Sequence, residues 1–417
     1  MLTRYLYGRI SQRHLLHKIA QVCFKMPRIN HEIMKWAREK AKLSLEDAAH
    51  KLNISDSISA SAVEKLTSYE SGSKTPSRSL ILRMSNKYRQ PLLTFYLERP
   101  PRIGDRGEDF RNLPDLLAEE IDSNVDVLIR DIKARQSIVR EALIAEQDEA
   151  RIDFIGKHSQ KDGQEQIVKT IKEILNFDLS EFRTQTSFKE AFRYLRRQAE
   201  AAGIFVLLKG NLGSHHSNID VTSFRGFVLS DEVAPFIVIN DLDAESAWSF
   251  TLIHEMAHLL FGDTGVSGMN VKLQKEQFCN NVASEFILPE EDFKTFQLSS
   301  LNFDTLKAEI SSYSKKTNVS NSHVAYRLLR RGTIERSLWR RLNDFYRNEW
   351  MKRRKKSKEE NKEKEGGPNY YVVRRYKLGA LLELARRLTY SGALTTTKAG
   401  LVLDMRPLKI HRLFQIV

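Results

Sequence analysis

The segment His254-Glu255-Met256-Ala257-His258 constrains this chain more than any other feature of its sequence. On a helix, His254 and His258 are four residues apart and lie on one face, where two imidazoles can bind one metal ion. Glu255 borders the same face and can accept or donate a proton. The flanking residues 250–253 and 259–261 are mostly apolar, which predicts a buried helix. Because unpaired buried polar groups are costly, a metal ion explains this trio better than the alternative, a pair of hydrogen-bonded structural histidines.

A catalytic zinc ion takes three protein ligands and leaves one position for water. Glu276 is the strongest candidate for the third ligand, because it follows His258 by 18 residues on a segment of helical apolar periodicity. Asn280, one turn further, is a candidate to donate a hydrogen bond to a metal ligand and so to orient it. The residues alone leave three other ligand candidates open: Glu285 as the main rival, and Asp263 and Cys279 as weaker ones.

The donor set predicts Zn²⁺, with manganese or iron as alternatives that bind similar ligands. Zinc lowers the pKa of bound water to about 7 and polarises a carbonyl group. Glu255 would take the proton of that water and pass it to the leaving amine. The sequence therefore predicts hydrolysis of a peptide bond. The candidates for stabilising the oxyanion are His215, His216 and Tyr313.

The pattern of apolar residues predicts an α+β fold that is mostly α. Short apolar runs at 204–208, 227–229 and 236–239 predict strands of a small sheet. An edge strand of such a sheet could pair with an extended substrate. Helical periodicity from about Glu245 to Phe261 places the histidine motif on a helix that ends at Gly262.

Composition argues for a cytoplasmic protein without a membrane span. No run of 18 or more apolar residues occurs, and no secretory signal is present. The two cysteines, Cys23 and Cys279, cannot form a disulfide framework. A reducing compartment is therefore expected.

Positive charge is concentrated near the C-terminus. The net charge is +14, and residues 327–358 hold 13 Lys/Arg against 3 Asp/Glu. Such a block can attract nucleic acid or an acidic partner. The preferred interpretation is a solvated helix face followed by a charged linker, because no residue pattern there clearly reads bases.

Several segments resemble the ImmA/IrrE metallopeptidases. They are Phe224–Phe227, Ala234–Asn240, Phe250–Leu259 and Glu276–Ala283, with Leu288-Pro289 closing the last helix. The resemblance implies a zincin-like peptidase domain in which His254, His258 and Glu276 bind zinc and Glu255 is the catalytic base.

The N-terminal part resembles the Xre/Cro-type helix-turn-helix domain that is often fused upstream of such peptidases. The matching segments are Ala37–Glu39, Leu43–Ala49, Tyr69–Gly72 and Pro76. Its candidate recognition helix offers Glu64, Lys65 and Ser68 for contacts with DNA. Residues 55–61 are longer and richer in serine than a tight turn, so contact with protein is the alternative role.

These patterns divide the chain into seven segments. They are a basic extension (1–25), a helix-turn-helix domain (26–98), a connector and long helix (99–160), the metallopeptidase domain (161–300), a helix-turn-helix-like helical region (301–347), a charged linker (348–368) and a small C-terminal helical region (369–417). The extension holds five Lys/Arg and no acidic residue, which fits a transit peptide or a stretch upstream of a natural start at Met26.

Two hypotheses of function follow. The first is a regulatory zinc endopeptidase. By resemblance, its protein substrate would be a helix-turn-helix repressor or antitoxin, and cleavage would control mobile-element, stress or phage-defence genes. The second is a DNA-binding regulator or toxin–antitoxin component that uses the peptidase fold to bind a partner. The full set of ligands and base favours the first, because a module that only binds does not need all four groups. A housekeeping protease or aminopeptidase fits the N-terminal domain less well.

Overall fold

The computed structural model describes residues 29–41, 43–88, 90, 92–97, 123–147, 151–213, 217–263, 269–363 and 369–415. The chain forms two compact units, residues 1–103 and 104–417. The expected extension at 1–25 lies outside the described residues.

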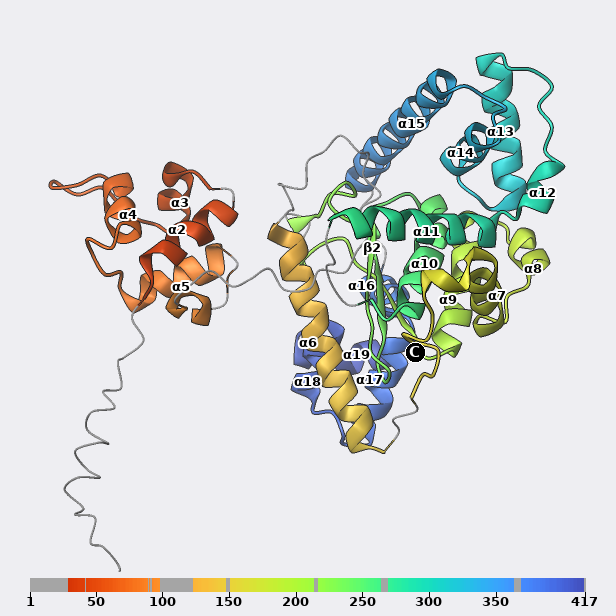
Figure 1. Ribbon diagram of the computed structural model, residues 1–417. Coiled ribbons are helices and arrows are strands. Elements are labelled where there is room, and N and C mark those ends of the chain that lie inside the picture. Colours follow the sequence, from red (N-terminus) through yellow and green to blue (C-terminus); the bar gives the residue numbers. More distant parts are fainter. Residues whose placement is uncertain are drawn as a thin grey trace, which may run out of the picture. The chain divides into compact units, whose positions relative to one another are not determined.

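The first unit is helical. Its elements are α2 (His31–Lys40), α3 (Leu45–Lys51), α4 (Ala62–Glu70), α5 (Arg78–Lys87) and the 3₁₀ helix η1 (Leu92–Tyr96), and the four α-helices are labelled in Figure 1. Ser44, Ser61 and Ser77 cap α3, α4 and α5, each accepting a hydrogen bond from a backbone N–H in the first turn. Arg38 of α2 donates to both carboxylate oxygens of Glu70 in α4, at 2.8 and 3.0 Å. This buried bidentate pair fixes α2 against α4.

The second unit is built around a sheet of three strands within the described residues. The strands β1 (Phe205–Leu208), β2 (Gly226–Leu229) and β3 (Phe236–Ile239) lie in the order β1–β3–β2. β3 runs parallel to β1 and antiparallel to β2. Nearly every strand residue is buried, so both faces of the sheet are covered. The three strands confirm the prediction made from the apolar runs.

One face of the sheet packs on the helices that carry the histidine motif. These are α7 (Gln164–Ile174), α8 (Leu179–Thr184), α9 (Phe188–Ala201), α10 (Glu245–Leu260) and α11 (Met269–Ile287), with η2 (Gln160–Asp162) before them. Val206, Val228 and Ile237 point into this layer. The long apolar helix expected around the motif is α10.

The opposite face packs on helices from both ends of the unit. These are α6 (Ser123–Ala145), α16 (Tyr370–Leu378), α17 (Ala380–Tyr390), α18 (Thr396–Leu403) and α19 (Ile410–Phe414), with the exposed η4 (Pro407–Lys409) between the last two (Figure 1). Leu207, Phe227 and Val238 point into this second layer. Successive strand residues alternate between the two layers, as strand geometry requires. The mostly α, α+β class is thus confirmed.

A further helical group follows α11. It comprises α12 (Glu290–Lys294), α13 (Phe303–Thr317), α14 (Asn321–Arg330) and α15 (Arg336–Glu363). The expectation of a charged linker at 348–368 was wrong for residues 348–363, which continue α15. The physical reason is that Lys, Arg and Glu, the residues that fill this stretch, have high helix propensity.

Within the described part of the chain, no helix combines the length and the apolar character that crossing a membrane requires.

A cluster of charges joins the second layer to the end of β1. Asp404, which ends α18, lies 2.6 Å from Lys209 Nζ, 3.0 Å from Arg374 Nη2 and 3.4 Å from Arg135 Nη2. Burial alone would raise the pKa of Asp404, but these three cations lower it well below its ordinary value. The carboxylate therefore stabilises the folded state while it is ionised.

We expect Asp404→Asn to lower the free energy of unfolding by about 2 kcal/mol, less than for a fully buried pair because the carboxylate is partly exposed. Asparagine is chosen because it tolerates the left-handed backbone at this position (φ 53°). Urea denaturation at pH 7 measures the loss. Since the folded pKa lies below the ordinary 3.8, the difference from wild type should shrink as the pH falls below about 4. The exposed Asp153→Asn serves as control, and an equal effect of both variants would contradict the assignment.

Candidate metal centre

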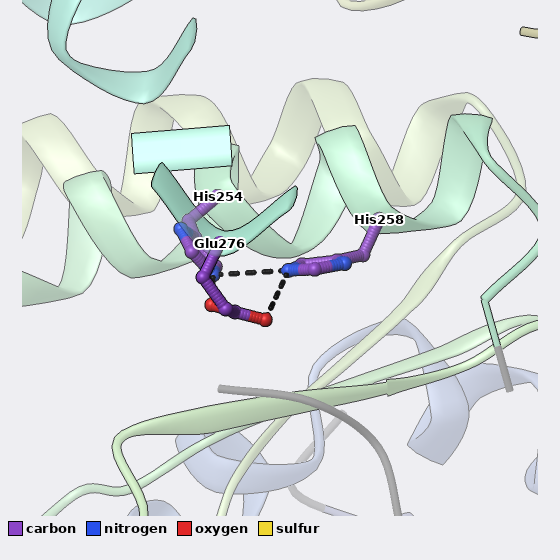
Figure 2. Close-up of side chains that lie close together, drawn as sticks. All are labelled: His254, His258 and Glu276. Carbon is purple, nitrogen blue, oxygen red and sulfur yellow. Dashed lines mark hydrogen bonds and ion pairs between the residues drawn. The ribbon is translucent and has the colours of Figure 1, made fainter. Parts of the chain in front are cut away.

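Two helices bring the three expected ligands together. His254 and His258 lie on α10 and Glu276 lies on α11, and their ligand atoms are all within 4.8 Å of one another. The two Nε2 atoms are 3.1 Å apart. Glu276 Oε2 lies 3.2 Å from His254 Nε2, and Glu276 Oε1 lies 3.2 Å from His258 Nε2. Figure 2 shows the two imidazoles and the carboxylate converging on one point.

This arrangement fits a divalent cation. Two imidazole nitrogens and one carboxylate form a ligand set typical of catalytic zinc sites, which leave a fourth position open. Both histidines are fully buried, and the Glu276 side chain is 13% exposed. A cation between these groups would offset the cost of burying three polar side chains side by side.

The sequence around the motif explains why α10 is held so firmly. Its residues from Thr251 to Leu260 are all buried, because the helix lies between the sheet and α11. Apolar residues such as Ile253 and Met256 fill the space between the polar ones. The two histidines therefore have little freedom to turn away from Glu276.

A carboxylate beyond the ligands orients His258. Asp263 Oδ2 lies 2.9 Å from His258 Nδ1, and Lys275 of α11 donates to the other oxygen of Asp263. Gly262 reverses the chain after α10 with φ 68°. A carboxylate on Nδ1 favours the tautomer that keeps the Nε2 lone pair available to a metal. Asp263, expected only as a weak rival ligand, instead contacts Nδ1 of His258, the ring nitrogen that does not face Glu276.

The polar contacts shift the pKa values of these groups in opposite directions. Burial alone would raise the pKa of Glu276, but hydrogen bonds with His254 and His258 lower it to about 2. Burial lowers the pKa of His258, whereas Cys279, Asp263 and Glu276 together raise it well above its ordinary value. Asp263 stays ionised because His258 and Lys275 lower its pKa despite burial. The two carboxylates, Glu276 and Asp263, are thus both held in the ionised form.

The expected base, Glu255, lies against the sheet. It is fully buried, and a Cβ atom on Gly226 of β2 would come within 2.9 Å of its Oε1 and 2.6 Å of Thr251 Cγ2. Glycine at this position therefore allows β2 to approach α10 closely. This role of Gly226 was not predicted from the sequence, although a glycine at an apolar strand is a signal for close approach of another element.

The other residues expected near the site lie in different places. Asn280 is one turn beyond Glu276, and its Oδ1 is buried with no hydrogen-bond partner in the described part of the chain. Cys279 is buried beside His258. Glu285 was wrong as a rival ligand, because it accepts a hydrogen bond from Glu290 N at 3.0 Å and lies 3.5 Å from Arg327 Nη1.

The oxyanion candidates gain no support. Tyr313 stacks on Phe296 with ring centroids 4.1 Å apart, and its hydroxyl lies 3.5 Å from the Asp292 carbonyl. His215 and His216 lie outside the described residues.

The side chains proposed to contact DNA make contacts within the first unit. Glu64 accepts a hydrogen bond from Ser61 N at 2.8 Å and completes a capping box. Lys65 Nζ donates to the Ser55 carbonyl at 2.6 Å, and Ser68 Oγ donates to the Lys65 carbonyl at 2.7 Å. Reading of bases by these residues remains a prediction.

We expect Asp263→Asn to weaken zinc binding by roughly 10- to 100-fold, the usual cost of losing a hydrogen-bond partner of a metal ligand. Competition with a chromophoric chelator measures this affinity. Asp162→Asn is a matched control, because Asp162 also contacts a histidine, with 3.2 Å between its Oδ2 and His158 Nδ1, but that histidine is not a ligand. Unchanged zinc affinity in Asp263→Asn would contradict the role given to Asp263.

Comparison with known proteins agrees with this geometry. Residues 199–329 match the family model Peptidase_M78, described as the IrrE N-terminal-like domain. The match runs from the end of α9 into α14 and contains His254, Glu255, His258 and Glu276. Searches of curated proteins and of solved structures found no significant match. The family match supports the resemblance to the ImmA/IrrE family and a peptidase of the metallopeptidase type for this segment.

Proposed function

We propose that the protein is a regulatory zinc-dependent endopeptidase that hydrolyses a peptide bond in a partner protein. The observation that carries the proposal is the meeting of His254 and His258, on the same buried helix as Glu255, with Glu276 of the adjoining α11. The partner would be a helix-turn-helix repressor, whose cleavage would control mobile-element, stress or defence genes. This choice of partner rests on the resemblance alone.

The side chains have distinct roles in this proposal. His254, His258 and Glu276 would hold the zinc ion, and Asp263 would keep His258 oriented. A zinc ion bound there would lower the pKa of its water to about 7 and polarise the scissile carbonyl. Glu255 would accept the water's proton on its carboxylate and deliver it to the leaving amine.

The sheet would position the substrate. Within the described residues β2 pairs with no strand other than β3, and an extended substrate that paired along its other edge would add a strand to the sheet. Gly226, the first residue of β2, contacts Glu255. A peptide paired along β2 would therefore run past the proposed base.

Three variants test the metal and the base separately. We expect about one zinc per wild-type chain and loss of zinc in His258→Ala and Glu276→Ala. Glu255→Gln should keep its zinc but lose about 10²- to 10⁴-fold in kcat/KM, the usual contribution of a general base. Metal analysis and cleavage of a peptide library, followed by mass spectrometry, are the measurements. Wild-type protein without zinc after supply of the metal would contradict the proposal, as would full activity of Glu255→Gln.

A second candidate function, binding of nucleic acid, has one observation in its favour. Helix α15 exposes a series of cationic side chains. They are Arg336, Arg340, Arg341, Arg347, Lys352, Arg353, Lys355 and Lys356. Such a helix attracts phosphate backbones without reading sequence. This binding could accompany peptidase activity.

If α15 binds duplex DNA, removing two charges should reduce the slope of log affinity against log salt by about 2. The variant is Arg353→Gln/Lys355→Gln, and the control is Lys157→Gln/Lys161→Gln, which removes two exposed charges elsewhere. Fluorescence anisotropy at several salt concentrations gives the slope. Equal slopes for the two double variants would exclude α15 as the contact.

A further inference from the structure

A small cavity lies at the carboxyl end of β1, away from the metal ligands. Its volume is about 30 Å³, and four of the residues that line it are cationic; the others are Leu207, Leu208, Gly210, Asn211 and Leu378. The cationic side chains are Arg135 of α6, Lys209 at the end of β1, and Arg374 and Lys377 of α16. Three elements that are distant in sequence thus direct positive charge to one point.

The acidic residues around the cavity do not balance these charges. Lys377 pairs with Asp241 at 2.5 Å. The remaining three cations share Asp404 and Asp131, the latter lying 2.5 Å from Arg135 Nη2 and 3.7 Å from Lys209 Nζ. One positive charge is therefore in excess. Burial and the neighbouring Arg135 lower the pKa of Lys209, as expected where cations crowd together.

Two donors at the cavity lack acceptors. The Nε atoms of Arg135 and Arg374 are buried and have no hydrogen-bond partner among the described residues. The side chain of Arg135 is only 3% exposed. Its Nη atoms and those of Arg374 contact Asp404 and backbone carbonyls of residues 402–404, which fixes both guanidinium groups. Leaving charged donors buried and unpaired costs free energy.

We propose that this cavity binds a small oxyanion, with the terminal oxygens of a phosphate group as the best fit. A cavity of about 30 Å³ is too small for a whole phosphate group, so only part of the group would enter while the rest of the ligand faces solvent. A water molecule in the cavity would not offset the extra charge. A phosphate would offset it, and its oxygens are the acceptors that buried guanidinium N–H groups suit.

The bound anion would link α6, β1 and α16. β1 continues through Gly210 toward the segment that leads to β2 and Gly226. Binding would therefore stabilise the second helical layer against the sheet. This inference does not depend on the proposed peptidase activity.

Thermal unfolding of the full-length protein tests the site. Inorganic phosphate should raise the Tm relative to sodium chloride of equal ionic strength, because a ligand that binds only the folded state stabilises it. Calorimetric titration should show that Arg374→Lys, which keeps the charge but lacks the Nε donor, binds phosphate about ten-fold or more weakly. Arg375→Gln, the next residue and an exposed one, should bind phosphate like wild type.

The ligand-induced shift is compared within each variant, so an altered baseline stability of Arg374→Lys does not affect the result. Hydrogen exchange of the wild-type protein provides a second measurement that needs no variant. Phosphate should slow exchange in residues 207–211 and 370–378. A nucleoside monophosphate is titrated in parallel. Tighter binding of the nucleotide would identify a phosphate ester as the ligand, and tighter binding of inorganic phosphate would identify free phosphate. No phosphate effect on the wild type, or an equal loss in Arg374→Lys and Arg375→Gln, would overturn the proposal.

Discussion

The packing of α10 between the sheet and α11 is the constraint on which the rest of the structure depends. It buries every residue from Thr251 to Leu260, polar ones included, so the motif side chains can point only toward the few polar groups that the neighbouring elements supply. α11 provides Glu276 and Lys275, the turn at Gly262 provides Asp263, and β2 approaches closely because Gly226 has no side chain. Each of these contacts would be lost if α10 rotated or shifted along its axis.

Much of the metal centre could be predicted because it depends on local geometry. Four residues of helix place His254 and His258 on one face whatever the surrounding fold. The choice of Glu276 over Glu285 was harder. Nine residues of helix turn the second carboxylate to about the opposite side of α11, but the sequence does not say which side faces α10. The three strands could be predicted from short apolar runs bounded by loop residues, and the run at 236–239 gave the clearest signal because it is rich in β-branched residues.

The parts that were not predicted depend on contacts between elements distant in sequence. The link from His258 through Asp263 to Lys275 requires the chain reversal at Gly262 and the placement of α11, and no sequence pattern encodes both. The error at residues 348–363 had another cause. A run of Lys, Arg and Glu suits a solvated linker and a solvated helix alike, and only the continuous α15 distinguishes them.

The second helical layer extends the folding unit beyond the segment that matches the peptidase family. The residues that cover Leu207, Phe227 and Val238 come from α6 and from α16 to α19, which lie outside the segment 199–329 that matches the peptidase family. A fragment cut to that segment would expose an apolar sheet face to water and would tend to aggregate. We therefore expect that segment 199–329 does not fold stably by itself, because helices before and after it cover one face of its sheet. A truncation or recombination that removed these helices would leave that face without its hydrophobic core.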